Sequence, residues 1–295
     1  MIQSKGQKIF NVFNYIFLFI VCLTCLLPFI HLLAISFSSS VAVTSNIVRF
    51  WPVDFNIDAY AFAFMGGRFF EAFWVSVQRV FLGVIINLLL IVLTAYPLSL
   101  PGDRLMGRNY IMGFFVVTMI LNGGIIPTFI LVSNLGLLDT IWALVLPTAL
   151  PIFSMIVMMN FIRGLPMELQ ESAMMDGAGV VTILFRILLP LLKPCIATVG
   201  LFSIVTHWND WFAGLIYLRN PALYPLQTYL HFLLMDIEQI MQLAGRGDFA
   251  RIIARMSAQS GRAAQLFLGA IPMLMIYPFL QKYFITGLVI GSVKE

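Results

Sequence analysis

Apolar segments about 20 residues long recur along this 295-residue chain, and they constrain its fold more than any other feature. A helix of that length crosses a hydrocarbon core about 30 Å thick. Only 10% of the residues are charged, whereas a soluble domain carries roughly 25%. The sequence therefore predicts an all-α membrane protein with six spanning helices, at approximately 13–37, 73–97, 109–133, 141–162, 188–208 and 264–285.

The first apolar segment follows Lys5 and Lys8, as the apolar part of a signal peptide would. It continues for more than 20 residues, which is longer than a cleaved signal usually has. A retained spanning helix at approximately 13–37 is favoured, and the small residues Ser38–Ser40 leave a cleaved signal open.

The basic residues predict the orientation in the membrane, because cytoplasmic loops are enriched in Lys and Arg. With the N-terminus inside, nine lie on the cytoplasmic side and seven outside, five of those seven in segment 209–263. We expect a bacterial cytoplasmic-membrane protein with both termini in the cytoplasm. No basic run is long enough to predict nucleic-acid binding.

The three cysteines, Cys22, Cys25 and Cys195, lie in or beside apolar segments. Cys22 and Cys25 have C-x-x-C spacing, but no histidine or third cysteine is near them in the sequence. We interpret all three as packing residues, and we expect no disulfide, metal site or bound cofactor in this chain.

A polar segment at Leu165–Pro194 separates two predicted spans. Pro166 suits the first turn of a helix, and Glu168 and Glu171 suit the positive end of its dipole. Leu169, Ala173 and Gly177 recur at a spacing of four on one face, where small residues permit close approach by another surface, and Gly177 and Gly179 then predict a turn. Periodicity alone leaves open an ordinary amphipathic helix that lies on the lipid surface.

The order of residues in this segment resembles the EAA loop of ABC importer permeases. Glu171-Ser172-Ala173 matches the E-A-A element, with Ser172 in place of the first alanine, and Asp176-Gly177-Ala178 matches the later D-G-A. Leu189-Pro190 matches the closing L-P. The resemblance implies a coupling helix that docks on a cytoplasmic ATPase, with contacts from Glu171, Ser172, Ala173, Asp176, Gly177 and Ala178.

The resemblance to MalG-type sugar permeases extends over nearly the whole chain. Further similar segments are Asn134–Thr140, Trp208–Trp211, Tyr224–Thr228 and Gln281–Gly287. The long segment Met235–Gly261 resembles the LplC/YtcP-like branch, which is similar to alginate and oligosaccharide importer permeases. The resemblance implies a type I ABC importer transmembrane domain over 1–295, with a core at approximately 70–287.

The resemblance also implies partners. The chain has no G-x-x-x-x-G-K-[ST] run, so ATP and Mg²⁺ are expected on two separate ATP-binding subunits. A second homologous permease subunit, an extracytoplasmic solute-binding protein, a carbohydrate substrate and membrane lipid are also implied. A different solute, such as a glycerol-phosphate-like molecule, is the alternative substrate. An ion-driven secondary transporter would need an inverted repeat, and an embedded enzyme would need a catalytic constellation; neither is evident.

Polar residues inside spans pair with each other or line a cavity, since they are otherwise costly in lipid. Residues 207–211 combine hydroxyl-pairing groups with flat aromatic faces, which suits sugar recognition. Cross-helix pairing is the alternative for them, and it is favoured for Asn87 and Thr94. Arg79 could meet an anionic sugar, reach the interface, or pair with Glu71 or Asp210. The substrate-path candidates are Asn122, His207, Trp208, Asn209, Asp210 and Trp211.

Overall fold

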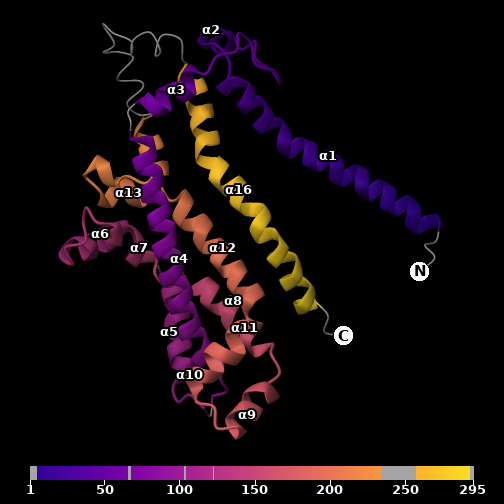
Figure 1. The fold of residues 1–295 in the computed structure, drawn as a ribbon, viewed down its shortest axis with the longest axis vertical. Helices are drawn as coiled ribbons and strands as arrows, with labels where there is room; N and C mark the ends of the chain where they lie inside the picture. The colour runs from indigo at the N-terminus through magenta and orange to yellow at the C-terminus, as the bar shows by residue number, and fades with distance from the viewer. Residues whose placement is uncertain (1–4, 66–67, 103, 122, 234–256, 293–295) are drawn as a thin grey trace. The chain divides into compact units, whose positions relative to one another are not determined.

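The computed structural model describes residues 5–65, 68–102, 104–121, 123–233 and 257–292 (Figure 1). Within these residues the secondary structure is helical, and none of them forms a strand. The chain divides into two compact units, Met1–Phe69 with Leu230–Ala270, and Phe70–Tyr229 with Ile271–Glu295. The all-α prediction is confirmed.

The first unit begins with α1 (Lys5–Ser36), a 32-residue helix with exposed apolar side chains on all its faces. Such a surface suits lipid, and the helix matches the span predicted at 13–37. Ser39 caps the short α2 (Ser40–Thr44) by accepting a hydrogen bond from the Ala42 N–H at 3.2 Å. Phe37 stacks on Tyr60 of α3 (Asp58–Met65), with ring centroids 4.9 Å apart.

The second unit is organised on α4 (Phe69–Ser99), an unbroken 31-residue helix that covers the span predicted at 73–97. Ile91, Ala95 and Leu98 on its buried face pack in a core that also contains Met158 and Leu188. Figure 1 shows α9 and α10 at one end of this unit and α6, α7 and α13 away from that end. The other helices are α5 (Arg108–Ile120), α6 (Ile125–Asn134), α7 (Ile141–Val145), η1 (Leu146–Thr148), α8 (Ile152–Arg163), α9 (Glu168–Met175), α10 (Val180–Thr182), η2 (Ile183–Leu188), α11 (Leu189–Leu191), α12 (Lys193–Asn209), α13 (Phe212–Tyr217) and η3 (Pro221–Leu223).

Three of the predicted spans are not continuous helices. The segment predicted at 109–133 bends by 112° between α5 and α6, and that at 141–162 bends by 50° before α8. The segment Val180–Leu191 meets α12 at 81°, so the span predicted at 188–208 is straight only from Lys193. Glycine or proline lies at each break. These residues favour a break because they weaken a helix or remove its backbone hydrogen bonds. They are Gly123, Gly124, Pro147, Pro151, Pro190 and Pro194.

The last helix, α16 (Ala258–Ser292), covers the span predicted at 264–285 and remains helical through Pro272 and Pro278. By length and composition, the described residues hold two unbroken candidate spans, or up to five when each bent pair is counted as one.

Candidate functional site

The coupling segment predicted from the sequence is built around α9. Its inner face is formed by Gln170 and Ala173, which are 5% and 7% exposed, and Ala173 packs in the core beside α8 and η2. The outer face is open to solvent and includes Met175, which is 88% exposed. The surface that Ala173 approaches is therefore this chain's own core, and Leu169 at the same spacing is 41% exposed.

Gly177 ends the helix in a left-handed turn. Its φ is +82°, a conformation that L side chains rarely adopt. The Ala178 N–H donates to the Ala173 carbonyl at 2.9 Å, and the Gly177 N–H donates to the Met174 carbonyl at 3.0 Å. This pair of bonds is a Schellman motif, with Asp176 as the C-cap. The D-G-A sequence thus satisfies carbonyls at the helix end, and the turn predicted at Gly177 is confirmed.

Glu171 and Ser172 both have hydrogen-bond partners within this chain. Glu171 forms an ion pair with Arg104, 3.3 Å from carboxylate to guanidinium, with both side chains substantially exposed. An exposed pair of this kind contributes about 0–1 kcal/mol. The Ser172 hydroxyl donates to the Glu168 carbonyl at 2.8 Å, so it closes on its own helix.

Arg79 is the most buried cation in the described residues, with 1% of its side chain exposed. Of the alternatives raised by the sequence, the structure selects the ion pair with Asp210. The guanidinium also donates to the backbone carbonyl of Asp210 at 2.5 Å and to that of Leu144 at 3.3 Å. Asp210 is held from its other side, because its Oδ1 accepts the Ala213 N–H at 3.1 Å.

The other residues of the 207–211 cluster divide between interior and surface. His207 and Trp208 are 2% and 3% exposed. The His207 ring lies against Gly83, and Trp208 contacts Phe73 edge-on at 5.9 Å between centroids. Both face the interior of this chain. Asn209 and Trp211 are exposed, and Asn122 lies outside the described residues.

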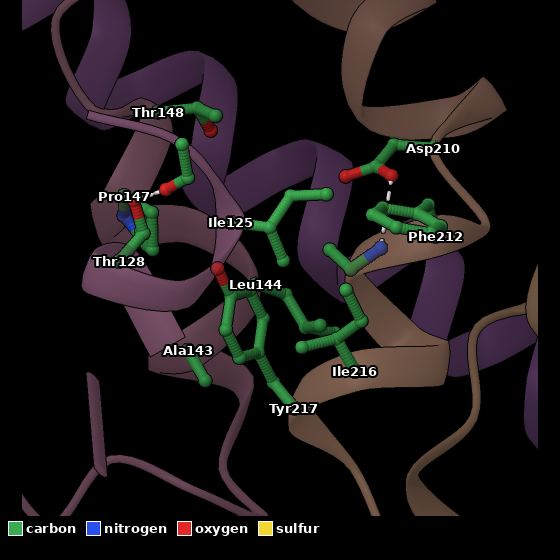
Figure 2. A pocket seen from close by; sticks show the side chains of 12 residues that line it. Ile125, Thr128, Ala143, Leu144, Pro147, Thr148, Asp210, Phe212, Ile216 and Tyr217 are labelled. Atoms are coloured by element: carbon green, nitrogen blue, oxygen red, sulfur yellow. Dashed lines mark hydrogen bonds between the residues drawn. The ribbon is translucent and has the colours of Figure 1, made fainter. Parts of the chain in front are cut away.

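A cavity of about 310 Å³ lies beside Asp210 (Figure 2). Thr128 and Thr148 stand on one side of it and Asp210 on the other. Phe212 and Tyr217 of α13 add aromatic surface. Asp210 is the one substrate-path candidate among the residues that line this cavity. Sequence reasoning missed Thr128, Thr148 and Tyr217, because the helix breaks that bring them together were not predicted.

A buried polar stripe on α4 continues from Arg79 toward Asn87. Asn87 is 3% exposed and shares a 2.9 Å hydrogen bond with the Ser203 hydroxyl on α12. In the amide orientation that satisfies both of its ends, its nitrogen donates to the carbonyls of Gly83 and Ala149 at 3.0 and 3.1 Å. Thr94 donates to the Leu90 carbonyl at 2.6 Å. Both residues have the cross-helix or intrahelical bonds expected of packing residues.

Comparison with known proteins agrees with this architecture. The family described as "Binding-protein-dependent transport system inner membrane component" matches residues 105–289. The polygalacturonan/rhamnogalacturonan transport system permease protein YtcP of Bacillus subtilis (strain 168) is 38% identical over 290 residues, which is 98% of this chain and 99% of YtcP. Protein LplC of the same organism is 36% identical, covering 100% of this chain and 98% of LplC.

A solved structure of a bacterial ABC transporter involved in the import of the acidic polysaccharide alginate contains a similar chain. The TM-score is 0.81 at 32% identity, covering 96% of this chain and 99% of that one. The resemblance stated from the sequence is confirmed, and so is the type I ABC importer permease fold. This chain belongs to the family of binding-protein-dependent transport system inner membrane components.

Proposed function

We propose that this chain is a permease subunit of an ATP-driven ABC importer that moves an oligosaccharide or polysaccharide fragment across the bacterial cytoplasmic membrane. The observation that carries the proposal is the construction of α9. Ala173 on its inner face packs in the core, and its outer face remains exposed. A short helix held in this way transmits a push or pull from a docked ATPase to the spans, because it cannot move independently of them.

The relatives support carbohydrate as the substrate class. YtcP is described as a polygalacturonan/rhamnogalacturonan permease, and the similar solved structure concerns alginate import. The cavity beside Asp210 offers threonine hydroxyls and aromatic rings, which suit a polyhydroxylated ligand. Arg79 already neutralises Asp210, so this half of the path recognises hydroxyl groups rather than net charge. Asp210 lies in the wall of this cavity as the partner of Arg79, and Asn209 and Trp211 are further candidates for the substrate path.

The proposal includes the partners that such a subunit requires. Two ATP-binding subunits bind ATP and Mg²⁺, one of them docking on the exposed face around Glu171 and Met175. A second permease subunit completes the pore, and an extracytoplasmic binding protein delivers the substrate. Both termini of this chain lie in the cytoplasm.

A matched pair of glycine variants tests the coupling role. Gly177→Val forces a β-branched residue to φ +82°, whereas Gly179 has ordinary extended backbone, φ −73° and ψ 162°, and open space around it. We expect Gly177→Val to reduce co-purification of the ATPase and substrate-stimulated ATP hydrolysis at least tenfold, while Gly179→Val retains most of both. Normal ATPase association in Gly177→Val, with the chain inserted in the membrane, would show that α9 is not the docking element.

A further inference from the structure

A second cavity, of about 300 Å³, lies on the inner side of the coupling segment. It forms where the ends of α4 and α8 and the beginning of α5 meet α9. The polar residues that line it are Ser99, Arg108, Arg163 and Gln170. The mechanism proposed above gives none of these four side chains a role.

Two guanidinium groups converge at this cavity. Arg108 Nε donates to the Leu98 carbonyl at 2.8 Å, and an Nη of Arg163 donates to the same carbonyl at 3.0 Å. A guanidinium has five N–H donors, so each retains donors that this shared carbonyl does not use. No carboxylate lines the cavity among the described residues; Asp103 lies outside them. The cavity therefore has a positive potential suited to an anion.

Gln170 requires a hydrogen-bond donor from the ligand. Its side chain is 5% exposed, and no group in the described chain donates a hydrogen bond to its Oε1. A buried acceptor without a partner is unfavourable, and proteins normally supply one. The ligand that fits this cavity thus combines an anionic group for the arginines with an N–H or O–H donor for Gln170.

We propose that this cavity binds the head group of a membrane phospholipid through its phosphate and through an ammonium or hydroxyl donor. Phosphoethanolamine and phosphoglycerol head groups carry both features; phosphocholine has the phosphate, but its quaternary ammonium has no N–H. Arginine pairs well with phosphate because its planar fork matches the oxygens. The site lies at the ends of α4 and α8 and the beginning of α5, and basic pockets between spanning helices on the cytoplasmic side bind head groups.

The bound head group holds α9 against the membrane. Gln170 belongs to α9, Arg163 ends α8, and Arg108 begins α5, so one head group would bridge three helices, with its phosphate on the two arginines and its donor on Gln170. This inference rests on the proposed function for the side of the membrane, which it assigns to the cytoplasmic leaflet. It makes the position of the coupling helix sensitive to lipid head-group chemistry.

Phosphatidylethanolamine and phosphatidylcholine with identical acyl chains test this, since both are zwitterionic and they differ in the donor. The intact transporter is delipidated in detergent, and lipid binding is measured by native mass spectrometry and by the shift in melting temperature. We expect roughly tenfold tighter binding of phosphatidylethanolamine, the effect of one hydrogen bond to a charged group. Equal binding of the two lipids overturns the proposal.

Variants assign the effect to the cavity. Gln170→Leu should remove the preference between the two lipids. Arg163→Gln should weaken the binding of both lipids roughly tenfold, and Arg163→Lys should recover part of that lost binding. Arg186→Gln is the matched control, because it removes the same charge from a residue that is exposed as Arg163 is but lies outside this cavity. If Arg186→Gln weakens binding as much as Arg163→Gln does, attraction is diffuse and the site is refuted.

Two further measurements distinguish the lipid from other occupants of the cavity. Inorganic phosphate that stabilises the lipid-free protein through Arg163, with no lipid preference, assigns the cavity to soluble phosphate and overturns the lipid source. If the ATPase subunit protects Gln170 from solvent in the absence of lipid, the cavity belongs to the interface with that subunit, and the proposal is also overturned. Failure here is distinguishable from failure of the proposed function. The Gly177 and Gly179 variants are compared for ATPase co-purification in one and the same lipid, and Met106→Cys, 92% exposed before α5, reports the membrane side.

Discussion

Replacement of Asp210 by asparagine separates a structural role of this residue from a role in the substrate path. The variant keeps an Oδ1 that accepts the Ala213 N–H, and it leaves the backbone carbonyl that Arg79 contacts. What it removes is the negative charge next to a guanidinium that is 1% exposed. Arg79 would then retain only neutral carbonyl and amide acceptors in this surrounding.

The expected loss is large because the cation stays buried. Breaking a buried ion pair by removal of one partner destabilises a protein by about 3–5 kcal/mol. The Asp210 side chain is 29% exposed, which favours the lower end, about 3 kcal/mol. With roughly 2–4 °C for each kcal/mol in a domain of this size, the melting temperature should fall by roughly 6–12 °C.

The double variant Arg79→Met with Asp210→Asn provides the internal test. Removing both charges is often neutral, since an apolar side chain of similar size fills the site. We therefore expect the double variant to recover part of the lost melting temperature, the remainder being the loss of the Arg79 donors to the Asp210 and Leu144 carbonyls. Asp54→Asn is the control: Asp54 is exposed, Ser39 donates to it only at 3.5 Å, and its φ of +51° suits asparagine.

The assay is thermal unfolding of the detergent-purified transporter, with uptake measured in vesicles from the same preparation. A bracing role of Asp210 is refuted if Asp210→Asn melts as the parent does while its substrate affinity changes, which would make Asp210 a substrate contact. It is also refuted if the double variant is no more stable than Asp210→Asn, because the unpaired charge of Arg79 would then not be the cause of the loss.

Three other expectations follow from the geometry. Gly214→Ala should destabilise the folded protein by about 1–3 kcal/mol, because the added Cβ would lie 2.9 Å from the Thr228 Cβ. The matched control is Gly200→Ala, whose melting temperature should not fall, since its added Cβ would make an ordinary contact with Leu88 at 3.8 Å. The backbone N–H groups of Arg219 and Asn220 lower the pKa of Asp139 by donating hydrogen bonds to its carboxylate. The stability that these bonds give the folded protein is therefore complete above the unfolded-state pKa near 4 and is lost as pH falls through the lower folded-state pKa. Melting temperatures measured over an acid pH series should show that loss in the parent and less of it in Asp139→Asn. Cysteines at Met106 and Arg219 should react with impermeant reagent from opposite membrane faces, and labelling from one face would contradict the predicted topology.

The sequence predicted elements that depend on local chemistry. Hydropathy located α1 and α4, because an unbroken apolar segment of this length has few alternatives in a membrane. The turn at Gly177 was predicted because the left-handed conformation favours glycine. The side of α9 that faces inward was not predicted. Spacing places Leu169 and Ala173 on one face, but only the tertiary structure shows that Gln170 and Ala173 form the buried one.

The helix breaks were missed because hydropathy averages over a window and ignores a single glycine or proline. Gly123-Gly124 and Pro147 each lie within segments that are apolar enough to span. The residues around the cavity beside Asp210 come from these bends, so a model of straight helices could not bring Thr128 and Thr148 close to Asp210. Arg79 illustrates the same limit, since its partner depends on where α12 ends.

The broken spans and the buried charge have a common physical explanation. A helix that ends inside a membrane leaves carbonyls without partners, and lipid supplies no donors for them. Arg79 donates to the Asp210 carbonyl where α12 ends and to the Leu144 carbonyl in the last turn of α7. Its positive charge also suits the negative ends of both helix dipoles.

Asn87 performs the neutral version of this role two turns along α4. Its amide donates to the Ala149 carbonyl, just beyond η1, and Ser203 ties it to α12. Arg79, Gly83 and Asn87 are spaced by four, so they form one buried stripe on the unbroken helix. The continuous α4 therefore supplies the donors that the discontinuous helices lack. A polar residue in a span of this family need not touch the solute, since making a broken helix tolerable in lipid is sufficient reason for its presence.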